Sequence, residues 1–335
     1  MGTLISEGEL YIWFANRTLD PCVKVFNKKG EEVQTTLLND AEKILGQITR
    51  VWMHHADSIF AYSYYVNTLV MLDKKGAIIE VNNLDDREDE NGNRYEFYPP
   101  YGNISPSDHI VFTTFLLKNE YASFHGSWES FSDFCKEMKN GYLLFGTGVS
   151  NKTNYSHFGL RLSQLREFPH NDSILFLPLW QTIIANNTPI FTNKYERNIY
   201  LLNDDLTIRR IIPVIPDSIE ILRPVKLISE ATKEEEILFM SKSENQRGSY
   251  INHIFYDDNR QIYIMTLLKN DTGTPVNMIR QINVYDSTFA IKKVLIIEDK
   301  EKYNGDFCFY MDSMIYIEKT DQQQDEKRIF EAFDV

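Results

Sequence analysis

Short apolar runs separated by polar turns recur along the whole chain, and this pattern is typical of β-strands joined by hairpins. One unit recurs most clearly at residues 25–38 (VFNKKGEEVQTTLL) and 71–84 (MLDKKGAIIEVNNL), with looser copies at 201–214 and 284–297. Asn and Asp favour turns because their side chains accept hydrogen bonds from nearby backbone N–H groups. We therefore predict turns that share one position in the unit, at Asn27, Asp73, Asn203, Asp286 and Asp334.

Two further strand-like runs precede each of these turns. The nearer runs begin with polar residues, at 9–12, 57–60, 140–143, 188–191, 259–263 and 312–316. The earlier runs are 48–55, 108–117, 173–180, 249–256 and 305–311. Three or four antiparallel strands, repeated at a spacing of roughly 50 residues, are the content of a β-propeller blade.

The repeats predict an all-β fold, a six-bladed β-propeller that forms one domain over residues 1–335. If the run at 108–117 begins its own blade, the count becomes seven. The first blade lacks an inner strand in this interpretation and the last blade lacks an outer one. We therefore expect an N-terminal segment to fill that gap and close the ring.

Two stretches depart from the strand pattern and are interpreted as insertions, near 118–140 and 215–247. Within the first, Phe131, Phe134, Cys135 and Met138 follow the i, i+3, i+4, i+7 spacing of an amphipathic helix. We predict a short helix near 130–139. The second stretch is longer than an ordinary connection and is expected to be an insertion or a lid.

The charge balance argues against nucleic acid and anionic lipid as binding partners. Lys and Arg total 35 residues, Asp and Glu total 48, and the net charge is -13. Proteins that bind nucleic acid or anionic lipid concentrate cations on one surface, and no basic cluster of five or more residues occurs here. No run of 18 apolar residues occurs either, so we expect no transmembrane helix.

Sequence motifs for cofactor chemistry are absent. The three cysteines, Cys22, Cys135 and Cys308, are far apart, which gives no support for zinc or iron–sulfur binding. No phosphate-binding glycine loop and no nucleophile elbow occurs. We expect no metal and no cofactor. The carboxylate pairs Asp204–Asp205 and Asp257–Asp258 are interpreted as turn residues.

The candidate binding residues are polar and aromatic side chains near the start of two inner strands. A binding site on a propeller is expected where inner strands begin and connections between blades meet. Trp side chains there can stack on sugars. The candidates are Arg50, Trp52 and His54 in the second blade, and Trp180 and Gln181 in the fourth blade.

The degenerate blades with their [Asn/Asp]-x-x-Gly hairpins resemble six-bladed propellers of the NHL and TolB-like type. The Asn-, Tyr-, Ile- and Lys-rich composition and the ending RIFEAFDV look more specifically like an uncharacterised propeller family of Bacteroidetes. The resemblance covers nearly the whole chain. It implies a cell-envelope protein that is lipid-anchored after removal of a leader peptide, and it assigns no catalytic residues.

These observations together predict a non-catalytic, extracytoplasmic, monomeric binding module for a glycan, a peptide or a protein partner of the envelope. Two alternatives stay open: a protein-interaction scaffold, and a carbohydrate-active hydrolase or lyase with its site at the propeller axis. The N-terminus carries no signal peptide. A cytoplasmic location is therefore the alternative to the envelope.

Overall fold

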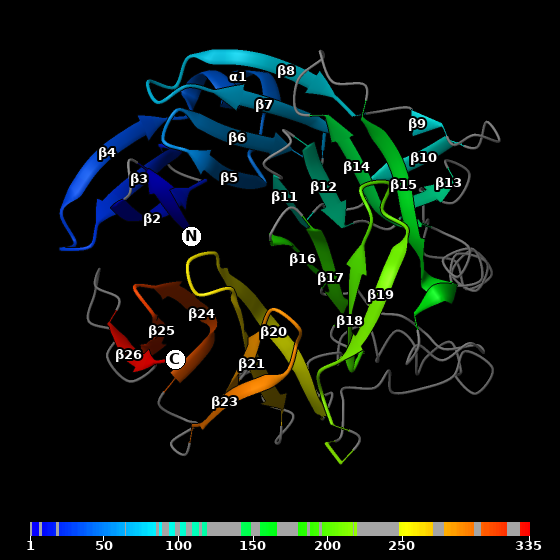
Figure 1. The fold of residues 1–335 in the computed structure, drawn as a ribbon. Coiled ribbons are helices and arrows are strands. Elements are labelled where there is room, and N and C mark those ends of the chain that lie inside the picture. Colours follow the sequence, from blue (N-terminus) through cyan, green and yellow to red (C-terminus); the bar gives the residue numbers. More distant parts are fainter. Residues whose placement is uncertain are drawn as a thin grey trace, which may run out of the picture.

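The computed structural model is all-β and propeller-like, with sheets arranged around a common centre (Figure 1). It describes residues 2–6, 9–17, 20–63, 65–84, 87–88, 94–97, 101–104, 109–113, 116–118, 142–148, 155–165, 180–185, 188–193, 196–216, 218–219, 248–270, 278–297, 303–319 and 329–335.

Three antiparallel sheets form the first half of the chain, and each has four strands. Sheet 1 contains β1 (Gly2–Ser6), β2 (Glu9–Asn16), β3 (Cys22–Asn27) and β4 (Glu32–Leu37). Sheet 2 contains β5 (Arg50–His55), β6 (Ser58–Ser63), β7 (Thr68–Leu72) and β8 (Ile78–Asn83). Sheet 3 contains β11 (Tyr101–Ile104), β12 (His109–Thr113), β14 (Tyr142–Gly148) and β15 (Ser156–Arg161).

The second half repeats this arrangement, except that its last sheet has three strands in the described residues. Sheet 4 contains β16 (Trp180–Ala185), β17 (Thr188–Asn193), β18 (Asn198–Leu202) and β19 (Ile208–Pro213). Sheet 5 contains β20 (Gly248–Asp257), β21 (Ile262–Asn270), β22 (Met278–Asp286) and β23 (Ile291–Ile296). Sheet 6 contains β24 (Tyr303–Met311), β25 (Met314–Lys319) and β26 (Phe330–Asp334).

Three short elements and two helical segments complete the described fold. A small sheet lies beside sheet 3 in Figure 1 and contains β9 (Arg87–Glu88), β10 (Arg94–Phe97) and β13 (Leu116–Lys118). Helix α1 (Asn39–Leu45) follows β4 and buries Ala41 and Leu45 against β6 and β7. A 3-10 turn, η1 (Leu162–Gln164), follows β15.

Four of the five predicted Asn/Asp turns are confirmed and share one geometry, whereas the turn predicted at Asp334 is wrong, because Asp334 is the last residue of β26 and pairs with Met314. In the turn after β3, the Asn27 side-chain oxygen accepts the N–H groups of Lys29 and Glu31, at 2.9 and 3.0 Å. Asp73 and Asp286 accept the equivalent pairs of N–H groups in sheets 2 and 5. Asn203 closes the turn of sheet 4 through its backbone bonds to Leu206 and Thr207.

The fourth residue of each turn adopts a positive φ, which glycine tolerates best. Gly30 and Gly76 occupy this position in sheets 1 and 2, with φ of 79° and 83°. Leu206 and Phe289 occupy it in sheets 4 and 5, with φ of 63° and 68°. A left-handed conformation costs an ordinary residue about 1 kcal/mol. Packing of these two side chains must offset that cost.

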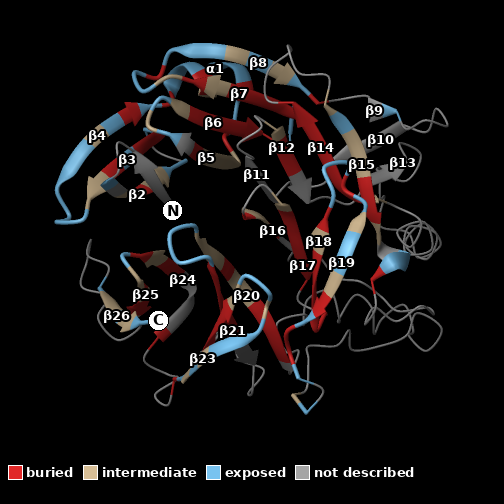
Figure 2. Cartoon of the chain, in the orientation of Figure 1, coloured by how far each residue is buried: buried red, intermediate tan, exposed pale blue. Residues whose placement is uncertain are grey.

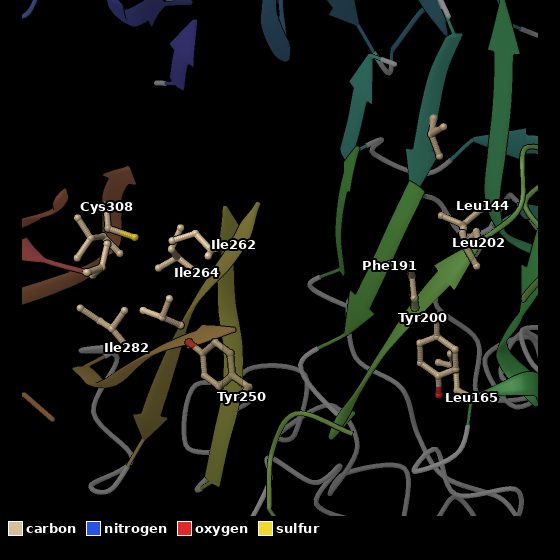
Figure 3. Packing of buried hydrophobic residues seen from close by; sticks show 14 of the residues in the cluster. Leu144, Leu165, Phe191, Tyr200, Leu202, Tyr250, Ile262, Ile264, Ile282 and Cys308 are labelled. Carbon is tan, nitrogen blue, oxygen red and sulfur yellow. The ribbon is translucent and has the colours of Figure 1, made fainter. Parts of the chain in front are cut away.

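Apolar side chains fill the spaces between neighbouring sheets, while the outer strands are largely exposed (Figure 2). Figure 3 shows two parts of the largest cluster: Phe191, Tyr200 and Leu202 of sheet 4 lie near Leu144 of sheet 3, and Ile262 and Ile264 of sheet 5 lie near Cys308 of sheet 6. Burial on both faces explains why the central strands read as nearly continuous apolar runs.

Neighbouring inner strands contact one another around the centre. β1 lies against β5, β11 against β16, β16 against β20, and β20 against β24. β24 also contacts β1, so the first and last sheets are neighbours. No strand of the described residues is exchanged between these two sheets, because β1 pairs with β2 and β26 pairs with β25.

This arrangement corrects two sequence-based expectations. Sheet 1 has its own inner strand, because the N-terminal strand β1 pairs with β2 and completes sheet 1 instead of the last sheet. In sheet 3 the run at 142 is the third strand, because β11 and β12 precede β14.

The predicted helix at 130–139 and the insertion at 118–140 lie outside the described residues, apart from Lys118 in β13. Most of 215–247 also lies outside them.

Candidate functional site

The two faces of the ring carry connections of different length. One face, here called the turn face, carries the hairpins that join first to second strands and third to fourth strands, such as residues 56–57 and 73–77. The opposite face, the crossover face, carries the connections between sheets and between second and third strands. The longest of these, by residue number, are 114–141, 162–179 and 214–247, and most of their residues lie outside the described part of the chain. Long connections on a rigid scaffold are where binding residues concentrate.

Arg50 and Trp52 lie on the crossover face, as the sequence predicted for the start of an inner strand. They are two residues apart on β5, so their side chains project to the same side of the strand. Both are half-buried. Trp52 contacts Tyr62, with ring centroids 6.4 Å apart and planes inclined at 52°. The Tyr62 hydroxyl donates to the Asn67 side chain at 2.6 Å, and this hydrogen bond restrains the Tyr62 ring.

A second arginine that sequence reasoning missed lies beside this pair. The Arg17 guanidinium, from the segment after β2, donates to the backbone carbonyl of Thr49. Thr49 directly precedes Arg50 and is itself held to the Tyr62 carbonyl through its N–H and its hydroxyl, at 2.8 and 3.0 Å. This hydrogen bond joins sheets 1 and 2 between residues that are 32 positions apart in the sequence. No local sequence signal near Arg17 indicates this partner.

The other predicted residues divide between the two faces. His54 is near the end of β5, beside the hairpin at 56–57, so it lies towards the turn face and not where the strand begins. The pairing of β5 with β6 shifts register between Met53 and His55, and the His54 side chain lies outside the described residues. Trp180 and Gln181 begin β16, opposite Asn193 and Thr192, and their side chains also lie outside the described residues. Arg50 and Trp180 are thus the first residues of two inner strands, with sheet 3 between them in chain order.

A buried carboxylate lies at the crossover face of sheet 4. Glu196 is fully buried and accepts hydrogen bonds from the Tyr200 hydroxyl at 2.9 Å and from the Asn198 amide at 3.1 Å. Its neighbour Arg197 donates to the backbone carbonyls of Pro216 and Ile219, both at 2.7 Å. Because buried charges need partners, this network anchors the start of the 214–247 connection rather than offering an open site.

Sheet 3 adds an aromatic–cationic pair to the crossover face. The Arg161 guanidinium donates to the Tyr142 hydroxyl at 2.8 Å, and its carbon lies 4.4 Å from the centre of the Tyr142 ring. Tyr142 in turn contacts Phe158, with ring centroids 5.3 Å apart. The crossover face of sheets 2 and 3 therefore presents arginines next to aromatic rings.

A second cluster of ionisable groups lies on the turn face, between sheets 3 and 4. Tyr155 stacks on His109 with ring centroids 3.7 Å apart, and His157 meets its edge at 4.7 Å. The Tyr155 hydroxyl donates to the Asp204 carbonyl at 2.7 Å. Burial, and next the charges of Asp204 and Asp205, raise the pKa of Tyr155 well above its usual range. This phenol therefore stays protonated and acts as a fixed donor.

The turn that faces Tyr155 holds its own carboxylate in place. Asp205 accepts hydrogen bonds from the Thr207 hydroxyl and N–H, at 2.5 and 3.0 Å. The hydrogen bond from the Thr207 hydroxyl, and next the one from the Thr207 N–H, lower the pKa of Asp205 below its usual value.

Within the residues that the structure describes, no group of three or more His, Cys, Asp or Glu side chains is placed to hold a metal ion.

Among the described residues, no helix is long and apolar enough to cross a membrane.

A comparison with one solved structure supports the fold. No protein-family model matches the sequence, and no curated protein matches it. A crystal structure of a DUF4221 family member from Bacteroides vulgatus is similar over 100% of this chain and 92% of that chain, with a TM-score of 0.70 and 15% identity. The resemblance to an uncharacterised Bacteroidetes family is therefore confirmed at the level of the fold.

Looser similarities extend to other proteins. The WD40 domain of Neurospora crassa Pan2 overlaps with a TM-score of 0.45 at 8% identity, over 100% of this chain and 79% of that chain. A periplasmic gluconolactonase from Pseudomonas aeruginosa overlaps with a TM-score of 0.43 at 9% identity, over 99% of this chain and 85% of that chain.

Proposed function

We propose that the chain is a six-bladed, extracytoplasmic binding module that recognises a glycan or peptide bearing a carboxylate on the crossover face. Sheets 1 to 6 are its blades in this proposal, and the small sheet of β9, β10 and β13 is an insertion. The observation that carries the proposed site is the placement of Arg50 and Trp52 on one side of β5, next to the backbone carbonyl that holds Arg17.

The chemistry of these side chains favours this class of ligand. A guanidinium pairs with a carboxylate through parallel hydrogen bonds, and an indole offers a flat apolar surface to a sugar ring or a side chain. Trp180 and Gln181 belong to the proposed site as the first residues of the inner strand β16. His54 is left out of it, because it lies near the turn-face end of β5. The proposed location is the cell envelope, with a lipid anchor and a monomeric state, and its support is the resemblance to the Bacteroidetes family.

Binding of defined acidic and neutral saccharides tests the proposed site. The probes are a muropeptide, polygalacturonate fragments and a neutral β-glucan, each measured by calorimetry. We expect an acidic probe to bind, R50A and W52A each to weaken its binding about tenfold, and R209A to leave it unchanged. Arg209 is the matched control because it is exposed on the outer strand β19.

Two outcomes contradict the proposal. One is equal binding of the acidic and the neutral probes, which removes the role of the arginines. The other is full binding by R50A and W52A proteins that remain folded. Turnover of a bound saccharide, seen as new reducing ends, overturns the non-catalytic assignment in favour of a hydrolase.

A further inference from the structure

Two neighbouring hairpins on the turn face carry the same basic tip. The first tip is Lys28–Lys29 before Gly30, and the second is Lys74–Lys75 before Gly76. The side-chain oxygens of Asn27 and Asp73 hold both turns in the same closed form. The equivalent turns of sheets 4 and 5 carry Asp204–Asp205 and Ser287–Thr288 instead. Among these four described turns, only those of sheets 1 and 2 have basic tips, in a chain whose net charge is -13.

These ammonium groups are largely available to a partner. Among the residues that the structure describes, Lys28, Lys29 and Lys75 form no ion pair, and Lys74 lies 3.5 Å from the exposed carboxylate of Asp57. Exposed pairs of that kind contribute little free energy and exchange easily for a better partner.

Exposed aliphatic side chains lie directly beside the tips on the edge strands of the same two sheets. Val33 and Leu37 of β4 are 51% and 52% exposed, and Ile79 of β8 is 53% exposed. Both strands stand at the end of their sheets, and Figure 2 shows β4 and β8 along the exposed outer rim of the ring. The outer strands of sheets 3 and 4 expose no large aliphatic side chain among their described residues, whereas β23 of sheet 5 exposes Ile291, Val294 and Ile296. Only sheets 1 and 2 combine such an edge with a lysine tip among the four described turns.

The two tips and the β4 edge form one surface because sheet 2 is docked on β4. The Thr36 hydroxyl donates to the Lys74 carbonyl at 2.8 Å. Gly76 lies so close to the Leu37 carbonyl that a Cβ at this position would be 2.3 Å from its oxygen. We call this the lysine surface, and it consists of Lys28, Lys29, Val33, Leu37, Lys75 and Ile79.

The edge of β4 also presents backbone groups. The Leu38 N–H donates to the Pro21 carbonyl across the β3–β4 pair. Because hydrogen-bonded and outward-facing residues alternate along an antiparallel edge, Thr35 directs its N–H and C=O away from β3. A lipid surface cannot satisfy such groups, whereas an added peptide strand can.

We propose that the lysine surface binds an extended polypeptide segment in which acidic and apolar residues alternate. Its carboxylates pair with the lysine tips, its apolar side chains cover Val33, Leu37 and Ile79, and its backbone pairs with Thr35. The surface carries no aromatic ring for base or sugar stacking, which favours a peptide over a nucleic acid or a glycan. The lysine tips lie on the turn face and β4 lies along the outer rim, so this site is separate from the proposed carboxylate site at the start of β5.

A short labelled peptide of alternating Glu and Val tests the proposal by fluorescence polarisation with the full chain. We expect it to bind at low salt, and an alternating Lys–Val peptide not to bind. The double variant K29E/K75E is expected to weaken binding at least about tenfold. The control K43E/K292E changes the net charge equally at exposed lysines elsewhere and is expected to bind normally.

A second variant separates strand addition from charge attraction alone. T35P removes the outward N–H of an edge strand while leaving the hydrogen bonds to β3 in place. We expect it to lose Glu–Val peptide binding without a change in the surface charge. Unchanged binding by K29E/K75E overturns the proposal, as does equal or tighter binding of poly-glutamate or of phosphatidylglycerol vesicles. Unchanged binding by T35P overturns the pairing with β4.

Discussion

Leu206 of sheet 4 lies on Gly159 of sheet 3 so closely that a Cβ at Gly159 would fall 2.1 Å from the Leu206 Cβ and 2.5 Å from its carbonyl oxygen. Leu206 is fully buried at the tip of the turn between β18 and β19. A turn of one sheet is therefore seated on the outer strand of the preceding sheet. Gly76 and the Leu37 carbonyl repeat this relationship between sheets 2 and 1.

Replacing Gly159 by Ala is expected to force sheets 3 and 4 apart. The neighbouring atoms include backbone atoms of Leu206, which cannot rotate away. Overpacking of this kind costs about 3 kcal/mol. Urea unfolding of G159A measures the loss, and the double variant G159A/L206G is expected to lose less than the two single changes added together. Wild-type stability of G159A would contradict the seating of the turn.

The pair G30A and G76A separates backbone strain from packing between sheets. Both glycines have nearly the same positive φ, so Ala at either position costs about 1 kcal/mol of strain. A Cβ at Gly30 meets no atom within 4 Å, whereas a Cβ at Gly76 meets the Leu37 carbonyl. We expect G76A to lower the melting temperature clearly more than G30A. Equal shifts would show that sheet 2 does not depend on this contact.

Leu206 and Phe289 occupy the same strained turn position but differ in burial. Glycine relieves about 1 kcal/mol of strain at either position. Phe289 is half-buried and stacks on Tyr263 with ring centroids 4.3 Å apart, whereas Leu206 is fully buried. We expect L206G to destabilise by about 3 kcal/mol and F289G to be much closer to neutral. Denaturant midpoints of the two variants check this order.

Alkaline pH is expected to destabilise the folded chain through its buried tyrosines. Burial, and next the charges of Tyr256 and Asp258, raise the pKa of Tyr263 to about 12. The folded chain therefore keeps this proton longer than the unfolded chain. Its contribution to stability is complete below about pH 10 and is lost as the pH rises towards about 12.

Chemical denaturation between pH 9 and 12, with tyrosinate absorbance recorded in parallel, measures this loss. We expect Y263F to fall less steeply than the wild type over the same interval, because it lacks this ionisable group. An identical pH dependence of the two proteins would assign the alkaline transition to other tyrosines, among them Tyr285 and Tyr310, whose pKa values burial also raises.

Local chemistry made the turns and central strands predictable. The Asn27, Asp73, Asn203 and Asp286 turns depend on contacts within five residues, which the sequence displays directly. The apolar runs that precede these turns form strands that are largely buried, and their continuous apolar composition therefore indicates a central strand directly. The two-residue spacing of Arg50 and Trp52 placed both on one side of β5 for the same reason.

Contacts between distant segments were not predictable. The anchoring of Arg17 on Thr49 and the seating of Leu206 on Gly159 each join different sheets, and nothing near either residue signals its partner. Helix α1 has only seven residues, too few for a helical period to stand out from its surroundings. The sequence pattern showed no copy of the Asn/Asp turn unit for sheet 3, and the sequence interpretation therefore misplaced β14 as a second strand.

The contact of β1 with β24 sets how the ring can come apart. Among the described residues, the strands of each end sheet pair only within their own sheet, so no backbone ladder crosses the joint between β1 and β24. A pull on the N-terminus would detach β1 from β2 and open the ring at that joint, leaving the other sheets intact. Amide protons of β1 should then exchange with deuterium before those of β6 or β21, and the ring would behave as a clasp that opens at one place.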